Sequence, residues 1–254
     1  FSLLKFSRAY APGTMSGAAG AGACSEEEPP SAKPKARSKL DPQGQYTRFP
    51  GVTVVCHVPP PAIEAALMGL PRAVRLLPGV GEWLAPLPAA SYHVTVLDVC
   101  TQDKLGLQDD AWAALLSSEG WAEAAAVYER AAFAPCLRLG AVNLIYEHPK
   151  LLLGIELEPA GPADRERLND AARPALEALV GEMRAPYCWH MTLAYGLPQL
   201  ADCEPLAPSE VAAARLVAKP LVEEAFRSFD GGVLPLRPAA LCTFDDMTSF
   251  VPWR

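Results

Sequence analysis

The chain has 254 residues, half of them apolar, with a formal net charge of −7 and 7 cysteines. A chain of this length and composition can bury a sizeable core, as one large domain or two small ones. The acidic balance argues against a protein that coats duplex DNA, but it leaves room for a local basic pocket that binds a nucleotide or an RNA end. The cysteines show no Cys-x-x-Cys spacing, which indicates neither a disulfide framework nor a zinc knuckle and fits a reducing compartment. No apolar run approaches the roughly 20 residues that span a bilayer.

The first 44 residues differ in composition from the rest of the chain. Gly, Ala, Ser and Pro dominate there and apolar periodicity is slight, which predicts a disordered tail over 1–44 and a domain over 45–254. The chain begins with Phe1 rather than Met, and its first ten residues carry two basic side chains and no acid. This composition suits either the end of an organelle transit peptide or a translated leader ahead of a start at Met15. We therefore expect a cytoplasmic protein, or a chloroplast or mitochondrial one in the first case.

The predicted elements alternate between strands and helices. Strands are indicated by β-branched and aromatic runs bounded by Pro or Gly, and helices by apolar residues three and four apart. In chain order we expect a strand over 52–58, a helix over 62–77 that breaks or kinks at Pro71, a strand over 91–99, a helix over 109–130, strands over 136–146 and 151–158, a helix over 162–183, a strand over 187–195, and one or two strands within 236–250. The two halves thus repeat the order strand, helix, strand.

Two of the predicted strands carry the same short motif, His-x-Thr followed by an apolar residue. The first copy, HVTV, begins at His93, and the second, HMTL, begins at His190. On a strand, residues i and i+2 share one face and lie about 6.6 Å apart, so Thr95 points with the first histidine and Thr192 with the second. An imidazole and a hydroxyl side by side can both contact one oxyanion. The repetition favours a functional pair over two unrelated structural histidines.

The repeated motif resembles the hallmark of the two-histidine (2H) phosphoesterase superfamily, which includes cyclic phosphodiesterases and 2′-5′ RNA ligase-like proteins. The compatible region runs from about Tyr46 to Trp253. Within it, FPGVTVVCHVP, SYHVTVLD and LCTFDDMTSFVPW are similar to a little-characterised subgroup of that superfamily. The resemblance implies an α+β, bilobal 2H phosphoesterase-like fold, in which two similar strand-helix-strand lobes with antiparallel sheets line a central cleft.

The chemistry follows if the two motif faces meet across that cleft. Phosphodiester cleavage needs a proton removed from the attacking oxygen and another delivered to the leaving oxygen. Two imidazoles with ordinary pKa values near 6.5 can do both without a metal or a cofactor. We expect His93 and His190 to be this catalytic pair, and Thr95 and Thr192 to hold the non-bridging oxygens. The sequence does not assign which histidine is the base.

Two tyrosines flank the second motif, and we expect Tyr187 and Tyr195 to contact the substrate as aromatic platforms for a base. The predicted protein is a monomeric phosphoric diester hydrolase of a nucleotide or RNA-end phosphodiester, such as a 2′,3′-cyclic phosphate, with no membrane partner. Whether it hydrolyses or ligates stays open. One alternative is a non-catalytic module that binds a nucleotide or RNA end in the same cleft. The other is a zinc hydrolase that adds His57, otherwise read as a structural residue, but the chain lacks a closely spaced ligand pair.

Overall fold

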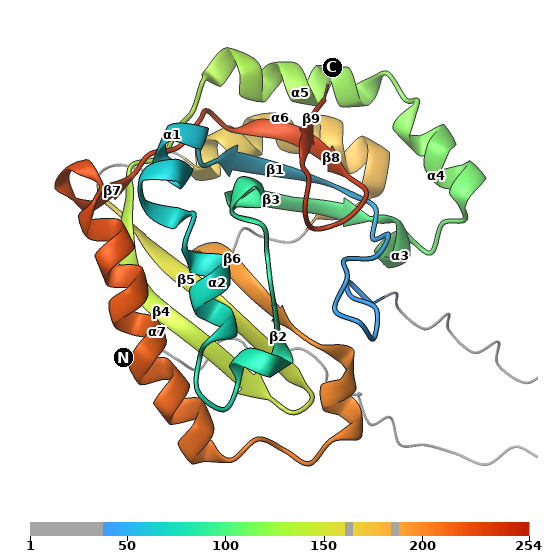
Figure 1. Ribbon diagram of the computed structural model, residues 1–254. Coiled ribbons are helices and arrows are strands. Elements are labelled where there is room, and N and C mark those ends of the chain that lie inside the picture. The colour runs from blue at the N-terminus through green and yellow to red at the C-terminus, as the bar shows by residue number, and fades with distance from the viewer. Residues whose placement is uncertain (1–37, 161–164, 184–187, 254) are drawn as a thin grey trace, which may run out of the picture. The chain divides into compact units, whose positions relative to one another are not determined.

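The structure, a computed structural model, describes residues 38–160, 165–183 and 188–253 (Figure 1). These residues form two antiparallel sheets with helices packed against them, which confirms the predicted α+β class. The four-stranded sheet has the order β3-β1-β8-β9, with bounds His93–Thr101, Gly51–His57, Ala240–Phe244 and Val251–Pro252. The five-stranded sheet has the order β2-β6-β5-β4-β7, with bounds Leu84–Pro86, Trp189–Gly196, Lys150–Pro159, Leu137–Glu147 and Val233–Leu234.

The two motif strands, β3 and β6, belong to different sheets. β3 is an edge strand of the four-stranded sheet, while β6 lies inside the five-stranded sheet between β2 and β5. The two strands nevertheless contact each other where the sheets meet (Figure 1). Val94 and Met191, the residues between histidine and threonine, are fully buried, as the alternation predicts.

Each half of the chain packs its helix on the sheet of the other half. α2 (Leu70–Arg75) lies between β1 and β3 in sequence but packs on β2 and β6. α6 (Arg165–Val180) lies between β5 and β6 in sequence but packs on β3 and on α5 (Gly120–Ala131) (Figure 1). The two units repeat the predicted strand, helix, strand order, and this exchange of helices interlocks them.

Two predicted helices are interrupted in the structure. The stretch 62–77 starts as a short helix (α1, Pro60–Ala62), continues as a π-helical turn (η1, Ile63–Leu67) and resumes as α2, with Pro71 in the first turn, where no backbone N–H is needed. The stretch 109–130 is two helices, α4 (Asp109–Leu116) and α5, rather than one. The Ser-Ser-Glu sequence between them, followed by Gly120 at the start of α5, favours a turn over a continued helix. A short helix, α3 (Gln102–Leu105), follows β3.

The longest helix of the described chain, α7 (Pro208–Arg227), has no counterpart among the predicted elements. It packs on β4, and Arg215 donates two hydrogen bonds, of 3.0 and 2.8 Å, to the carbonyl oxygen of Leu144. Its buried side chains recur three and four residues apart, as in an amphipathic helix: Val211, Ala214, Ala218, Val222, Ala225 and Phe226. None of the helices in the described part of the chain is both long and apolar enough to cross a membrane.

The packed unit begins before residue 45, where the sequence predicted the domain to start. We call residues 38–47 the N-terminal loop. Within it, Leu40 is only 3% exposed and forms a β-bridge with Tyr46, whose hydroxyl donates to the carbonyl of Ala85 at 2.9 Å. The turn between them places Gly44 at a φ of +77°, a conformation that favours glycine. Residues 38–44 therefore belong with the sheets and not with a tail.

Candidate active site

On the first motif strand, the strand pairing fixes which side chains share a face. His93 lies opposite His57 of β1, and Thr95 lies opposite Val55. Residues directly opposite each other in a sheet project to the same side, so His93 and Thr95 share one face, as predicted. Both are half-buried.

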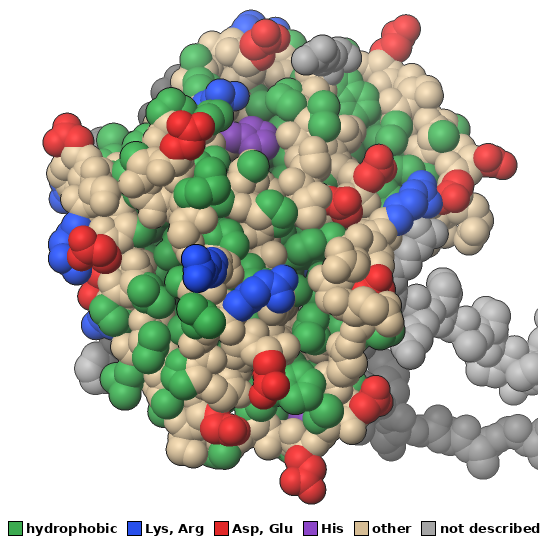
Figure 2. All heavy atoms as spheres, in the orientation of Figure 1, with side chains coloured by type: hydrophobic (Ala, Val, Ile, Leu, Met, Phe, Trp, Pro, Cys, Tyr) green, Lys and Arg blue, Asp and Glu red, His purple; other side chains and the backbone are tan. Residues whose placement is uncertain are grey.

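The second motif strand repeats this arrangement. His190 lies opposite Glu156 of β5, and Thr192 lies opposite Gly154, which puts both motif side chains on one face of the five-stranded sheet. Both are half-buried, and Glu156 accepts a hydrogen bond of 3.2 Å from the Asn143 side chain. The space-filling view shows a histidine reaching the surface between hydrophobic and charged side chains (Figure 2).

Each motif strand also carries a β-bulge directly after its threonine. The extra residue is Val96 in β3 and Leu193 in β6. Because an extra residue reverses the alternation, the third side chain on each motif face is Asp98 on β3 and Tyr195 on β6. Strict alternation from the sequence would have placed Leu97 there, and Asp98 was therefore missed. Two consecutive apolar residues after each threonine are the signal that could have indicated the bulges.

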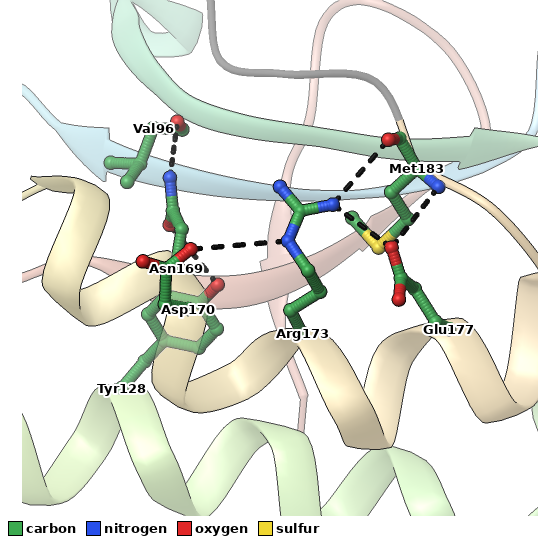
Figure 3. Close-up of polar contacts among 7 residues, drawn as sticks. All are labelled: Val96, Tyr128, Asn169, Asp170, Arg173, Glu177 and Met183. Carbon is green, nitrogen blue, oxygen red and sulfur yellow. Dashed lines mark hydrogen bonds and ion pairs between the residues drawn. The ribbon is translucent and has the colours of Figure 1, made fainter.

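The bulge in β3 is held by a polar network from α6 (Figure 3). The side-chain amide of Asn169 donates to the carbonyl of Val96 at 3.4 Å and accepts from the hydroxyl of Tyr128 at 3.3 Å. Asn169 is 1% exposed, so its partners are needed to offset its desolvation. On the same helix, Arg173 bonds the carboxylate of Glu177 at 2.9 Å. The bond from Asn169 ties α6 to the bulge residue Val96 of β3. It thereby stabilises the bulge that brings Asp98 onto the motif face.

The two motif histidines are anchored in the same way. The Nδ1 atom of His93 lies 2.8 Å from the carbonyl oxygen of Ser91, and that of His190 lies 3.2 Å from the carbonyl oxygen of Cys188. A carbonyl can only accept, so each Nδ1 carries the proton and donates it. In the neutral ring the other nitrogen, Nε2, is then the basic one. Both imidazoles are thus set in the tautomer that can take up a proton at Nε2.

His93 has a low pKa. Burial is the main cause, and the charges of His57, His190 and Lys39 act in the same direction, against the hydrogen bond to Ser91, so that the pKa falls to about 4. The ring of Phe250 packs on the imidazole with 4.0 Å between centroids, which supplies part of the burial. His93 is therefore neutral at pH 7.

The pKa of His190 is also lowered, first by burial and then by the charge of Lys39. The hydrogen bond to the Cys188 carbonyl and the charge of Asp98 oppose this shift. Asp98 forms an ion pair of 2.6 Å with Lys104, which partly neutralises it. The charge of His190 is one of the causes of the low pKa of His93, and β3 and β6, the strands that carry the two rings, contact each other.

The remaining predicted residues are placed as follows. Tyr195 lies on the second motif face, and its ring packs edge to face on Tyr46 with 6.4 Å between centroids. Tyr187 lies outside the described residues. The Nε2 atom of His57 lies 3.8 Å from the sulfur of Cys242, and burial lowers the pKa of its ring. Within 38–160, 165–183 and 188–253, no three His, Cys, Asp or Glu side chains are grouped to hold a metal ion.

Comparisons with known proteins found a family model and a solved structure that are similar to this chain. Residues 39–130, which include the first motif, match a family model named 2H-phosphodiest and described as "Domain of unknown function (DUF1868)". The fold is similar to that of a conserved protein of unknown function, ATU0111 from Agrobacterium tumefaciens str. C58, at 20% identity and a TM-score of 0.62, over 85% of this chain and 89% of the other. No curated protein matches the chain. The family model supports the resemblance to two-histidine phosphoesterases and, in general terms, a phosphodiesterase-like role. The solved structure supports the fold.

Proposed function

We propose that the chain is a metal-independent phosphodiesterase that hydrolyses a nucleotide or RNA-end phosphodiester, with a 2′,3′-cyclic phosphate as the favoured substrate. One observation carries this proposal: two imidazoles on neighbouring strands, each held by Nδ1 to a backbone carbonyl, each beside a threonine hydroxyl. This arrangement presents two basic nitrogens and two hydroxyl donors to one phosphate.

His93 is the general base in this proposal. Its ring is neutral at pH 7 because its pKa is about 4, so Nε2 is available to take a proton from an attacking water. The water oxygen forms a bond to phosphorus while the bond from phosphorus to the ribose oxygen breaks. A base of low pKa is a weak one, but the bound phosphodiester anion raises the pKa of a nearby imidazole as the reaction proceeds.

His190 is the general acid. It takes up a proton at Nε2 and gives it to the leaving ribose oxygen. Burial lowers the pKa of His190, and the charge of Asp98 opposes this shift and favours the protonated form that this role needs. Thr95 and Thr192 donate to the non-bridging oxygens, whose negative charge grows in the transition state. Tyr195, and Tyr187, which precedes the motif in sequence, contact the base or sugar. The protein acts as a monomer, and duplex DNA is not a substrate.

The test is a panel of 2′,3′-cyclic and linear nucleotides incubated with the purified protein, with products identified by ³¹P NMR. We expect a cyclic nucleotide to be converted to a single monophosphate ester, and a folded His93→Ala variant to leave it intact. Calorimetric titration runs beside it. If the wild-type protein binds a cyclic nucleotide but never turns it over, it is a binding module that keeps the site without the chemistry.

A further inference from the structure

Lys39 approaches the second motif face from the N-terminal loop. Its ammonium donates a hydrogen bond of 3.2 Å to the hydroxyl of Tyr195 and lies 4.3 Å from the centroid of that ring. The ring of Phe49 lies on another side, 5.4 Å from the same nitrogen. Two aromatic rings thus stabilise the cation without neutralising it.

The position of Lys39 is fixed by the fold. Its carbonyl accepts a hydrogen bond of 3.0 Å from the backbone of Thr47, and the next residue, Leu40, is buried and bridged to Tyr46. Because the backbone is fixed and the ammonium already contacts the rings of Tyr195 and Phe49, the side chain loses less freedom than an unrestrained lysine when it binds a ligand. This distinguishes Lys39 from lysines on exposed helices such as Lys219, whose side chain is 68% exposed.

The ammonium of Lys39 has no carboxylate partner among the described residues, although other basic side chains there form ion pairs, such as Lys104 with Asp98. Lys39 is half-buried, so water screens its charge only in part. A cation held among aromatic rings without a counter-charge gives its surroundings a positive potential. An anion that enters there is stabilised.

The site that receives this potential is the motif face. The bulge at Leu193 brings Tyr195 onto the same face as Thr192 and His190. The hydroxyl of Tyr195 accepts the hydrogen bond from Lys39. The charge of Lys39 reaches both motif histidines, since it lowers the pKa of each. Lys39 and Tyr195 also line a pocket of about 630 Å³, whose floor continues along the sheet through Leu152 and Ile145.

We propose that Lys39 is a further substrate-binding residue, whose ammonium, positioned by Tyr195, binds a non-bridging oxygen of the substrate phosphate beside Thr192. The inference rests on the proposed function, because it assigns the anion as the phosphate that His93 and His190 act on. Lys39 offsets the charge of the bound phosphodiester in a half-buried site where threonine hydroxyls alone do not. The remainder of the substrate then extends over Tyr195 into the pocket.

The experiment compares wild type, Lys39→Met, Lys39→Arg and Lys219→Met. Methionine keeps most of the aliphatic stem that packs on Tyr195 and Phe49 but removes the charge, and thermal unfolding checks that each variant is folded. Affinity for inorganic phosphate is measured by calorimetry, and the pKa values of the motif histidines by NMR titration without ligand. We expect Lys39→Met to weaken phosphate binding about tenfold or more and to raise both histidine pKa values, Lys39→Arg to restore most of the affinity, and Lys219→Met to change neither.

Two outcomes overturn the inference: a folded Lys39→Met variant that binds phosphate as tightly as wild type with unshifted histidine pKa values, or a wild-type protein that does not bind phosphate. Turnover separates this inference from the proposed function. Phosphate binding that depends on Lys39 without turnover of any phosphodiester supports the lysine and contradicts the enzyme. Turnover of a cyclic nucleotide that is unchanged in Lys39→Met supports the enzyme and contradicts the lysine.

Discussion

Replacing His93 by asparagine should make the stability of the protein less sensitive to acid. Burial holds the pKa of His93 at about 4, below the 6.5 of an unfolded chain. The stability that the neutral ring provides is therefore complete above about pH 6.5 and is lost as the pH falls towards 4, because the unfolded chain takes up a proton that the folded protein does not. The His93→Asn variant removes this titration, while its amide can still donate to the carbonyl of Ser91.

The size of the effect follows from the shift. At about pH 5, a shift from 6.5 to about 4 corresponds to about 2 kcal/mol. Solvent reaches part of the half-buried ring and screens it, so we expect about 1 kcal/mol. The pKa values of His57 and His190 are also lowered, but these rings are present in both proteins and largely cancel in the difference.

The assay is urea unfolding of wild type and His93→Asn at about pH 7.5 and about pH 5. Wild type should lose about 1 kcal/mol more than the variant between the two conditions. Equal losses in the two proteins would mean that His93 titrates normally, and the assignment of His93 as the neutral base would lose its physical basis.

Three further outcomes are expected. Removing residues 1–37 should leave the melting temperature unchanged in calorimetry. Removing 1–44 should lower it by several degrees, because burial of Leu40 contributes about 1.5–3 kcal/mol to stability. Equal melting temperatures of the two truncated proteins would show that the N-terminal loop does not contribute to stability. Thr95→Val and Thr192→Val should each lower kcat/KM about tenfold to a hundredfold, through one lost bond to a charged oxygen, without moving the pH profile; a loss of 10⁴ or a moved profile would place threonine in the proton transfer. Turnover should survive EDTA, and a complete loss restored by Zn²⁺ would transfer the chemistry to a metal.

The motif strands were predictable because their pattern is local. The sequence around each histidine is rich in β-branched and aromatic residues, which indicates a strand. In a strand, successive side chains point to opposite faces, and Val94 and Met191 are buried as this alternation requires. The alternation fails where Val96 and Leu193 bulge, since a bulge depends on the neighbouring strand and on Asn169 of a distant helix. This is why Asp98 was not found.

Other features depend on tertiary contacts that the sequence pattern does not contain. α7 was missed because half of its buried side chains are alanine and Pro220 interrupts the pattern, yet packing on β4 holds it as one helix. The exchange of α2 and α6 between sheets cannot be read from element order. Lys39 belongs to a stretch whose Gly, Pro and Lys content is typical of a tail, and only the burial of Leu40 and the ring of Tyr195 bring it to the site.

The most direct measurement is the turnover of a 2′,3′-cyclic nucleotide by His93→Ala, His190→Ala and the double variant, each shown to be folded by circular dichroism. Each single change should cost about two to four orders of magnitude in kcat, because it removes either the base or the acid. The double variant should be hardly slower than the slower single variant, since the pair acts as a unit. A folded single variant that turns over substrate at the wild-type rate would contradict the two-histidine mechanism.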